Sequence, residues 1–416
     1  MSNRDTPEEA EFRAEVRTWL EAHAEPRRPS GNWSDGPREH TREQEAAYFE
    51  RCREWQRVKF DGGYAAIAWP SRYGGRDGSA VQQMIYAEEE AAFDVTNGFL
   101  SAPIALVGPA LMAHGNPEQC ERYIHPLLRA EEVWCQLFSE PEAGSDLARL
   151  GTRAERSGDE FVVNGQKVWT TNAQYAHFGI LLARTDPDAP KHGGISFLLV
   201  DMRDPGVEVR PLRTMQNSND FNEVFFSDVR VPVENVVGEI NGGWAVARTT
   251  LANESVMIGS GAQAEDSAEA LLELAREQGA LDDPLTRQEL AEALINQRIL
   301  AMFRERMTEA VRDGRMPDLD GSVMKIFWSE SRIQRADLGL RILGAEGALD
   351  GADAPKHGSW QTAALGRGLG SIGGGTHEVH RNGIGERVLG LPREPRADRA
   401  MSYRELVAHD ASVVKN

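Results

Sequence analysis

The chain has 416 residues, which is long enough for two or three domains with a sizeable shared core. Hydrophobic residues make up 40% of it and charged residues 27%, an ordinary composition for a soluble protein. The formal net charge of -19 argues against nucleic-acid binding and against docking on anionic membranes, because both require a basic surface. The N-terminus is too acidic for a signal or transit peptide, and no apolar run approaches a membrane span. We therefore expect a cytoplasmic protein.

The cysteine content is low. Cys52, Cys120 and Cys135 show no spacing that predicts a disulfide framework. Free thiols in a reducing compartment are expected instead, and Cys135 is expected to be a small buried hydrophobic residue.

The first part of the chain, residues 1–132, predicts an N-terminal helical domain. Apolar residues recur at helical spacing at Phe12, Val16, Trp19 and Leu20. A polar stretch with proline and glycine, from Glu25 to Pro37, predicts an exposed loop. Further helical patterns cover residues 48–60, 81–93 and 109–128, with a turn at residues 69–75.

Residues 133–240 predict an antiparallel β domain. Runs of β-branched and aromatic residues, separated by Gly, Pro, Asn and Asp, are typical of short strands. They cover residues 161–171, 194–202, 206–212 and 222–231. Within the first run, Asn164-Gly165 predicts a hairpin turn.

Helical patterns return after Gly242-Gly243 and predict a C-terminal helical domain over residues 241–392. They cover residues 244–278, 284–311, 321–343 and 377–389, and residues 393–416 are expected to form a tail. Helices, then strands, then helices predict a multidomain α+β protein.

Two segments carry most of the chemistry. In CQLFSEPEAGSD, residues 135–146, Gly144 and Ser145 can bring backbone N–H groups and a hydroxyl close to a phosphate. In NGQKVWTTN, residues 164–172, a strand end delivers Trp169, Thr170 and Thr171 together, which suits a flat heterocycle that is stacked and hydrogen-bonded. Taken singly, a Gly-Ser turn is usually only a turn and a strand Trp usually belongs to a core. The prediction of a binding site therefore rests on the occurrence of both segments together at this spacing.

Both segments closely resemble the flavin-binding motifs of the acyl-CoA dehydrogenase family, and GGGTHEVHRNGIGERVLGLPRE resembles its glycine-threonine segment. The resemblance covers nearly the whole chain. It implies the fold of that family, in which a middle β domain lies between an N-terminal helical domain and a C-terminal domain like a four-helix bundle. It also implies FAD as the cofactor, an acyl-CoA substrate, an electron acceptor such as an electron-transfer flavoprotein, and a homodimer or homotetramer.

The resemblance further implies roles for individual residues. Near the flavin ring it places Gln136, Phe138, Ser139, Trp169, Thr170 and Thr171. Gly144 and Ser145 would meet the diphosphate, with Ser145 also close to the substrate, and Thr376 and Glu378 would lie against the FAD. Arg341 and Gly344, in RILGAEG, match a segment that reaches the FAD of a neighbouring subunit. The Arg-x-x-Phe-Gly segment that grips this FAD in the family is replaced here by residues 277–288. Arg341 could equally be an ordinary arginine at a helix end.

Members of this family oxidise an acyl-CoA thioester to its α,β-enoyl form. A carboxylate removes the α-proton while a hydride leaves the β-carbon for flavin N5. The commonest position of that carboxylate, two residues before Thr376, is occupied here by Gly374. In isovaleryl- and long-chain-type members the carboxylate instead comes from a C-terminal helix, several residues before a run of small residues. Glu254 stands at that position, before Gly259–Gly261.

Glu254 is therefore the predicted base, although a glutamate on an amphipathic helix is usually a solvated surface group. The residue after this glutamate is commonly Arg and is Ser255 here, so substrate contacts around it are expected to differ. The substrate-binding turn is expected at Gly374 and Gly375. The Gly374 N–H would still donate to the thioester oxygen, and the missing side chain leaves room for a branched or bulky acyl group. Parts of residues 97–112 are expected to line the acyl pocket.

Two alternatives remain within the fold: a flavin-dependent oxidase or hydroxylase, and a non-catalytic subunit of a heteromeric dehydrogenase. Two other motifs predict no site. GLGSIG, residues 368–373, has G-x-G-x-x-G spacing but follows no predicted strand. His377 and His380 lack the longer spacing of zinc hydrolases, so no metal site is expected.

Overall fold

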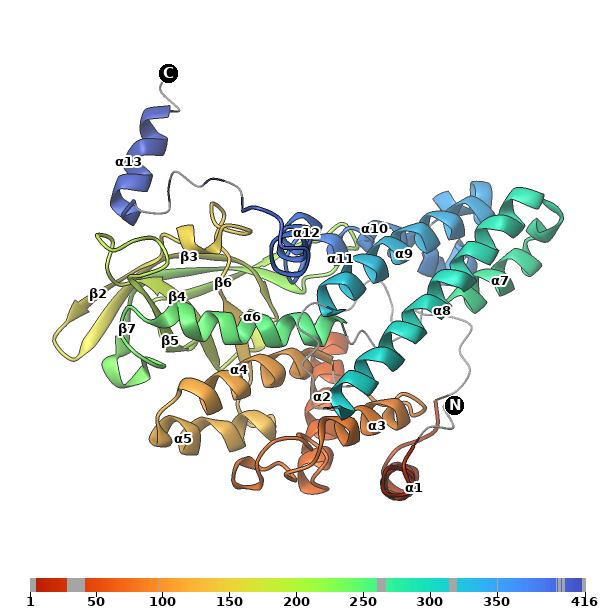
Figure 1. Cartoon of the computed structure of the whole chain (residues 1–416), viewed down its shortest axis with the longest axis horizontal. Helices are drawn as coiled ribbons and strands as arrows, with labels where there is room; N and C mark the ends of the chain where they lie inside the picture. The colour runs from red at the N-terminus through yellow and green to blue at the C-terminus, as the bar shows by residue number, and fades with distance from the viewer. Residues whose placement is uncertain are drawn as a thin grey trace.

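Three groups of elements follow one another along the chain, and each occupies its own part of the molecule (Figure 1). This computed structural model describes residues 5–27, 42–96, 98–259, 267–313, 320–349, 351–393, 395, 398 and 401–413. In that part of the chain, N-terminal helices precede a seven-stranded sheet, and further helices follow it. The predicted order of helical, β and helical parts is confirmed.

The N-terminal part contains α1 (Pro7–His23), α2 (Arg42–Asp61), α3 (Ala80–Glu90), α4 (Ser101–His114) and α5 (Pro117–Leu128). The start of α1 follows from local sequence, because Thr6 and Glu9 form a reciprocal capping box and Pro7 occupies the first turn. Its apolar stripe buries Phe12, Val16 and Leu20, as the spacing predicts. The predicted turn at residues 69–75 contains a short 3-10 helix (Ser71–Tyr73), which ends at the left-handed Gly74. Most of the predicted loop from Glu25 to Pro37 lies outside the described residues.

The helical pattern predicted across residues 109–128 is interrupted. Helix α4 ends at His114, and Gly115 adopts an extended conformation. Asn116 then caps α5, since its side chain accepts a hydrogen bond from the N–H of Gln119. Capping chemistry at this junction overrides the continuous apolar pattern.

The middle part consists of β1 (Trp134–Leu137), β2 (Arg153–Ser157), β3 (Glu160–Thr171), β4 (Phe178–Arg184), β5 (Ile195–Asp201), β6 (Val207–Leu212) and β7 (Phe221–Pro232). They form one sheet in the order β1-β4-β2-β3-β7-β6, with β5 also paired to β4. Most pairs are antiparallel, but β1 runs parallel to β4, and β2 meets β4 in parallel at Arg153. The prediction of an antiparallel domain holds for most strand pairs and is wrong only for the pairing of β1 and β2 with β4. The parallel β1–β4 pair is possible because β2 and β3 separate these two strands along the chain.

The hairpin predicted at Asn164-Gly165 is also wrong. Strand β3 continues through both residues, and the chain reverses earlier, at the left-handed Gly158 between β2 and β3. Gly165 instead lies at a bulge opposite β7, where a Cβ would come within 2.5 Å of Thr152 Oγ1. The glycine is therefore needed for the close approach of two strands rather than for a turn.

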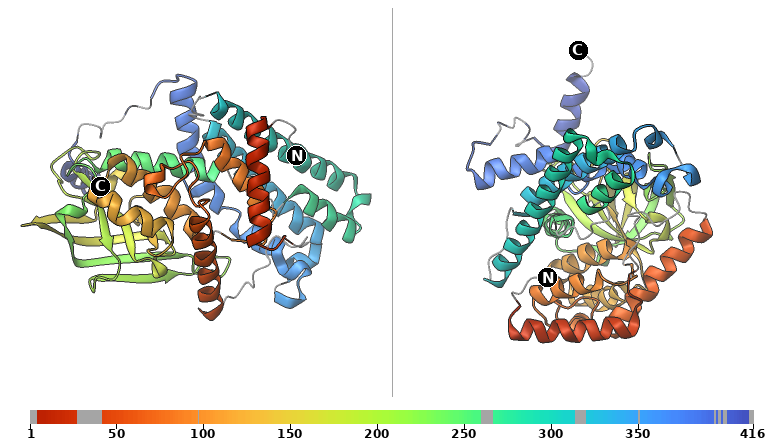
Figure 2. Two further views of the ribbon diagram at one scale, coloured as in Figure 1. Left: turned by 90° about the horizontal axis from the view of Figure 1, so that it is seen from below. Right: turned by 90° about the vertical axis from the view of Figure 1, so that its right-hand side faces the viewer.

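Strand β4 is buried on both faces and joins two cores. Phe178, Ile180 and Leu182 face a core shared with α2, α4 and α5, whereas Leu181 and Ala183 face a core within the sheet. The N-terminal helices and the sheet are therefore held by one continuous apolar contact. Figure 2 shows these helices on one side of the sheet and the C-terminal end of the chain on the other.

The C-terminal part contains α6 (Gly243–Gly259), α7 (Ala268–Glu277), α8 (Pro284–Arg312) and α9 (Asp320–Leu343). Shorter helices follow: α10 (Ser359–Gly366), α11 (Leu369–Ile372), α12 (His377–Gly383), a π turn (Ile384–Val388) and α13 (Tyr403–Val413). The pattern predicted over residues 244–278 comprises both α6 and α7. GLGSIG forms α11 and its flanks, and no sheet strand adjoins it in the described structure. Within the described residues, no helix is both long and apolar enough to cross a membrane.

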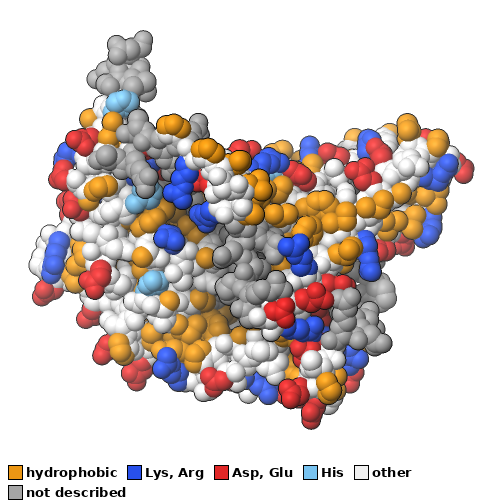
Figure 3. Space-filling model, viewed as in Figure 1, with side chains coloured by type: hydrophobic (Ala, Val, Ile, Leu, Met, Phe, Trp, Pro, Cys, Tyr) orange, Lys and Arg blue, Asp and Glu red, His pale blue; other side chains and the backbone are white. Residues whose placement is uncertain are grey.

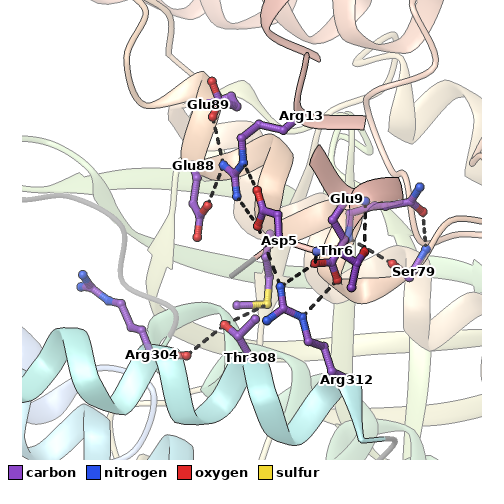
Figure 4. Close-up of polar contacts among 12 residues, drawn as sticks. Asp5, Thr6, Glu9, Arg13, Ser79, Glu88, Glu89, Arg304, Thr308 and Arg312 are labelled. Atoms are coloured by element: carbon purple, nitrogen blue, oxygen red, sulfur yellow. Dashed lines mark hydrogen bonds and ion pairs between the residues drawn. The ribbon is translucent and has the colours of Figure 1, made fainter. Parts of the chain in front are cut away.

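Ionic contacts tie the long helix α8 to the N-terminal part (Figure 4). Arg312 of α8 lies 2.8 Å from a carboxylate oxygen of Glu9, and Arg13 pairs with Asp5 at 2.6 Å and with Glu89 of α3 at 2.9 Å. The pairs share partners, so they act as a network that connects α1, α3 and α8. Because several members are partly exposed, each pair contributes modestly to stability.

Candidate active site

The two segments singled out in the sequence lie against each other. The N–H of Val168 donates to the carbonyl of Ser139 at 2.9 Å. Beside this contact, Lys167 Nζ donates to the Phe138 carbonyl at 2.9 Å and to Glu140 Oε1 at 2.7 Å. The Lys167 side chain is completely buried, and that of Glu140 is 9% exposed. A buried ion pair therefore joins the strand end that carries Trp169 to the turn that carries Gly144.

Glu140 also closes the loop that follows it. Its carboxylate accepts hydrogen bonds from the N–H groups of Gly151 at 2.6 Å and Thr152 at 2.9 Å. Burial alone would raise the pKa of Glu140, but Lys167 and these N–H donors outweigh it, so the pKa lies below its ordinary value. The carboxylate is thus a charged anchor at neutral pH.

Arg184, at the end of β4, anchors the same loop from the other side. Its guanidinium donates to the carbonyls of Ala148 at 2.7 Å and Leu150 at 3.4 Å. It also donates to the carbonyls of Lys191 at 2.9 Å and Gly193 at 3.1 Å. Burial lowers the pKa of Arg184 to about 10, which still leaves it charged at neutral pH.

Lys191 provides a third anchor, because its Nζ lies 2.9 Å from Asp146 Oδ2. Gly144 and Ser145, just before Asp146, are exposed at the tip of the loop, and a Cβ added at Gly144 would meet nothing within 4 Å. The predicted phosphate-binding turn is therefore open at its tip and fixed at its base.

At the end of β3, the register with β7 shifts between Lys167 and Thr170. Trp169 takes a left-handed backbone conformation with φ of 59°, and its side chain is 62% exposed. Its ring meets Phe221 edge-on at a centroid distance of 5.9 Å. Thr171 is exposed as well. The shift therefore turns a large aromatic side chain outward beside the loop.

Buried polar atoms without partners lie at the same strand end. Among the described residues, Thr170 Oγ1 is buried and has no hydrogen-bond partner, and the same holds for Oδ1 of Asn172 and of Asn222. Asn222 stands opposite Thr170 in the β3–β7 register. Such atoms normally find a partner in the functional state of a protein.

The remaining predicted residues of the first segment differ in accessibility. Gln136 is half-buried on β1, and Ser139 is half-buried after it. The Phe138 ring is buried and packs edge-on against Phe197 at a centroid distance of 5.9 Å. Phe138 therefore contributes its carbonyl to this region, while its ring belongs to the core.

A glycine-rich turn precedes α12. Gly374 and Gly375 have φ values of 64° and 91°, a conformation that favours glycine. His380 Nε2 donates to the Gly374 carbonyl at 2.9 Å, and Lys325 Nζ donates to the Gly375 carbonyl at 2.5 Å. Thr376 caps α12 by accepting the N–H of Val379. Glu378 is exposed on the first turn. Both carbonyls of the turn are therefore held by side chains.

Helix α9 supplies most of the support for this turn. Besides Lys325, it provides Ser322, whose Oγ lies 2.9 Å from His380 Nδ1, and Ser329, whose Oγ lies 2.5 Å from His377 Nε2. Because the proton of a neutral His380 must reside on Nε2, its Nδ1 accepts from the Ser322 hydroxyl. Burial, followed by the nearby Lys325, lowers the pKa of His377, and burial is also the main cause of the lowered pKa of His380.

Glu254 lies on α6, but its side chain is outside the described residues, and Ser260 and Gly261 of the small-residue run also lie outside them. The helix itself packs against α4 and α9. Helix α9 also supports the glycine turn. Gly374 and Glu254, the two positions at which the family places its carboxylate, therefore lie on elements that both contact α9.

Family models match this chain in three consecutive blocks. Descriptions of the acyl-CoA dehydrogenase N-terminal, middle and C-terminal domains match residues 6–131, 135–229 and 241–389, respectively. The chain belongs to the acyl-CoA dehydrogenase family.

Relatives extend over nearly its full length. This acyl-CoA dehydrogenase is 37% identical over 390 residues to "Acyl-CoA dehydrogenase IpdE1" of Mycobacterium tuberculosis, covering 92% of the chain and 98% of the relative. A structure titled "Tcur3481-Tcur3483 steroid ACAD" superposes with a TM-score of 0.77 at 32% identity and covers 95% of this chain and 100% of that one. The ChsE4-ChsE5 complex from M. tuberculosis gives 0.74 at 31% identity, again covering 95% and 100%.

Arg341 and Gly344 lie apart from the glycine turn of this acyl-CoA dehydrogenase. Arg341 stands 16 residues after Lys325 on α9, about 24 Å along the helix axis. It pairs with Glu289 of α8 at 2.7 Å and lines a cavity of 470 Å³ between α8 and α9. Gly344 follows α9 with φ of 56°, where it ends the helix. Contact of Arg341 with the FAD of a neighbouring subunit stays a prediction.

Sequence reasoning missed the residues that hold the site together. They are Glu140, Lys167, Arg184, Lys191 and Lys325. One signal was available. Lys167 occupies an inward-facing position on β3, directly before residues 168–171, which alternate between buried and exposed. A lysine at such a position requires a buried anion. Nothing local identifies Glu140 as that anion, since other acidic residues stand beside it.

We expect Lys167→Met to lower the free energy of unfolding by about 3–5 kcal/mol, because it leaves the Glu140 carboxylate buried without its cation. Urea denaturation measures this loss. Arg230→Met is the matched control, since it removes the exposed pair with Glu160 on the same sheet and should cost less than about 1 kcal/mol. Equal losses in the two variants would contradict the anchoring role of Lys167.

The histidines of α12 predict a pH dependence. Their pKa values lie below the ordinary value, so they stabilise the fold above about pH 6.5, and this stability is lost as the pH falls through the folded-state pKa. Urea midpoints should therefore fall between pH 7.5 and pH 5.5, and less steeply in His380→Asn. The control His357→Asn changes an exposed histidine and should keep the wild-type slope. A wild-type slope in His380→Asn would refute this assignment.

Proposed function

We propose that this acyl-CoA dehydrogenase binds FAD at the joined flavin segments and dehydrogenates an acyl-CoA between its α and β carbons. The contact that carries this proposal is the buried Lys167–Glu140 pair, which joins the segment that carries Gly144 and Ser145 to the strand that carries the exposed Trp169. The partnerless Thr170 Oγ1 and the open space at Gly144 fit a flat cofactor with phosphate groups.

Each group would have a distinct part in binding the cofactor. Trp169 and Thr171 would present an aromatic face and a hydroxyl to the ring, and Thr170 and Gln136 would add polar atoms. Gly144 and Ser145 present N–H groups and a hydroxyl to the diphosphate. Thr376 and Glu378 contact the cofactor from the C-terminal part. FAD, when bound, would supply the acceptor for the substrate hydride.

The proton would be removed by the Glu254 carboxylate. A base there can act only if enolate-like charge on the thioester oxygen is stabilised. We propose that the N–H of Gly374 donates to that oxygen, with Gly375 completing the turn. His380 and Lys325 support this role, because they hold the two carbonyls of the turn and so restrict rotation of its peptide groups.

We propose a bulky, multi-ring acyl-CoA as the substrate. Gly374 stands where the commonest carboxylate of the family would be, and its lack of a side chain would leave room beside the thioester. A structural relative at 32% identity is titled a steroid ACAD, which favours a ring system over a straight acyl chain. An electron-transfer flavoprotein would then reoxidise the enzyme in the cytoplasm.

The test is Glu254→Gln in FAD-loaded protein, mixed anaerobically with a panel of straight-chain and steroid acyl-CoA thioesters. Because Gln cannot accept the α-proton, we expect at least a thousandfold slower bleaching of the flavin absorbance, of the order of a lost general base. Glu273→Gln, which alters an exposed glutamate on α7, should bleach at the wild-type rate. Bleaching that survives Glu254→Gln overturns the assignment of the base, and rapid oxygen consumption by the reduced wild type would favour an oxidase.

We further propose that the chain works in an assembly with a second chain of its family. Exposed apolar side chains on α8, among them Leu285, Ile295 and Met302, leave an apolar band along this helix (Figure 3). A relative at 31% identity is titled as a complex of two differently named proteins, which favours a heteromer over the homodimer or homotetramer implied by resemblance.

Native mass spectrometry of the chain expressed alone checks this assembly. If a different family member is required, the isolated chain should hold substantially less than one FAD per subunit and should not bleach with substrate. A homodimer or homotetramer that is fully loaded with FAD and turns over substrate would contradict the heteromer.

A further inference from the structure

The end of the chain docks on the middle domain beside the flavin segments. We use the term strap for Asp398 together with residues 401–406. The N–H of Tyr403 donates to the Ala189 carbonyl at 3.1 Å, and that of Arg404 donates to the Pro187 carbonyl at 3.0 Å. Leu406 is buried at this contact. Figure 1 shows α13, which begins within the strap, above the sheet and away from the bundle.

An ionic bridge connects the strap to the phosphate-binding turn. Lys191 Nζ lies 2.6 Å from Asp398 Oδ2 and 2.9 Å from Asp146 Oδ2, and the Lys191 side chain is only 4% exposed. Asp146 directly follows Ser145. A single buried ammonium therefore holds the turn and the strap at once, with one carboxylate on each side to compensate its charge.

Tyr403 reaches the second anchor of the loop. Its ring lies over the Arg184 guanidinium, with the Cζ atom 4.3 Å from the ring centroid. The edges of this guanidinium hold the Ala148 and Leu150 carbonyls, which follow the turn. Because Arg184 is almost fully removed from water, an aromatic face over its plane is a favourable partner. The strap thus contacts the supports on both sides of the loop.

The strap lies beyond the three matched domain models. The matched C-terminal domain ends at residue 389, before the strap begins. Its contacts are nevertheless specific: Ser402 and Glu405 form a reciprocal cap at the start of α13, and Ser402 pairs with Pro190 across an antiparallel bridge. A segment without a function would not be expected to place a carboxylate and an aromatic ring on the two buried cations of the site.

We propose that the strap positions the Gly144–Asp146 turn for the FAD diphosphate, with Asp398 and Tyr403 as positioning residues. This inference rests on the proposed FAD site. The strap holds Lys191 and Arg184 in place, and these in turn hold the loop on both sides of the turn. Without the strap, the turn would retain its Glu140–Lys167 anchor but lose the ordering of its second half.

The experiment compares full-length variants by amide hydrogen exchange of residues 141–150 and by titration with FAD. Tyr403→Ala and Asp398→Asn should each speed exchange of this segment at least tenfold and raise the FAD dissociation constant about tenfold. Tyr403→Phe keeps the ring over Arg184 and should restore wild-type values. Asp188→Asn is the charge-matched control, because it removes an exposed strap contact with Arg404 and should leave both readouts unchanged.

Each result decides the inference. Faster exchange in both variants, with rescue by Tyr403→Phe, supports the strap even if the wild-type chain binds no FAD, in which case the proposed function alone fails. If amide hydrogen exchange of residues 141–150 is unchanged in these variants, the positioning role of the strap is overturned, whether or not FAD binds. Equal acceleration in Asp188→Asn, or loss of the near-ultraviolet circular dichroism of the whole protein, would show general destabilisation and also overturns it.

Discussion

The architecture of the candidate site depends on one buried ion pair. Lys167 and Glu140 come from the two segments that resemble flavin-binding motifs, and their contact at 2.7 Å brings those segments together. Burial of an ammonium requires a nearby anion, and burial of that anion requires further donors, which the Gly151 and Thr152 N–H groups supply. The outward-facing Trp169 and the open tip at Gly144 lie on the two segments that this pair joins.

A second constraint organises the C-terminal half of the site. Helix α9 packs against α6, which carries Glu254, and it also holds the glycine turn through Lys325 and Ser322. In the mechanism that we propose, a carboxylate on α6 replaces the one expected at Gly374, and α9 supports both positions. The grip on the turn carbonyls explains why the turn keeps a defined shape although two successive glycines form it.

The end of the chain shows how a segment beyond the matched domains can serve the same site. Lys191 and Arg184 are buried cations that need compensation, and the strap meets them with a carboxylate and an aromatic face. The loop of residues 139–152 is consequently supported by β3, by β4 and by the strap. Support from three directions suits the proposed role of this turn, which is to present backbone N–H groups to a charged ligand.

The sequence by itself determined the family, the order of helical and β parts and most long elements, and it supplied the residues that we propose for the cofactor site. These depend on local periodicity and on short motifs, as in α1, β5 and the segment that ends at Thr171. It misjudged Asn164-Gly165, because a glycine needed for close strand approach has the same local pattern as one in a turn. Only the tertiary structure decided that β1 runs parallel to β4, that Lys167 meets Glu140 and that Tyr403 covers Arg184. Each of these joins residues far apart in the chain, and burial, rather than local sequence, selects the partner of a buried charge.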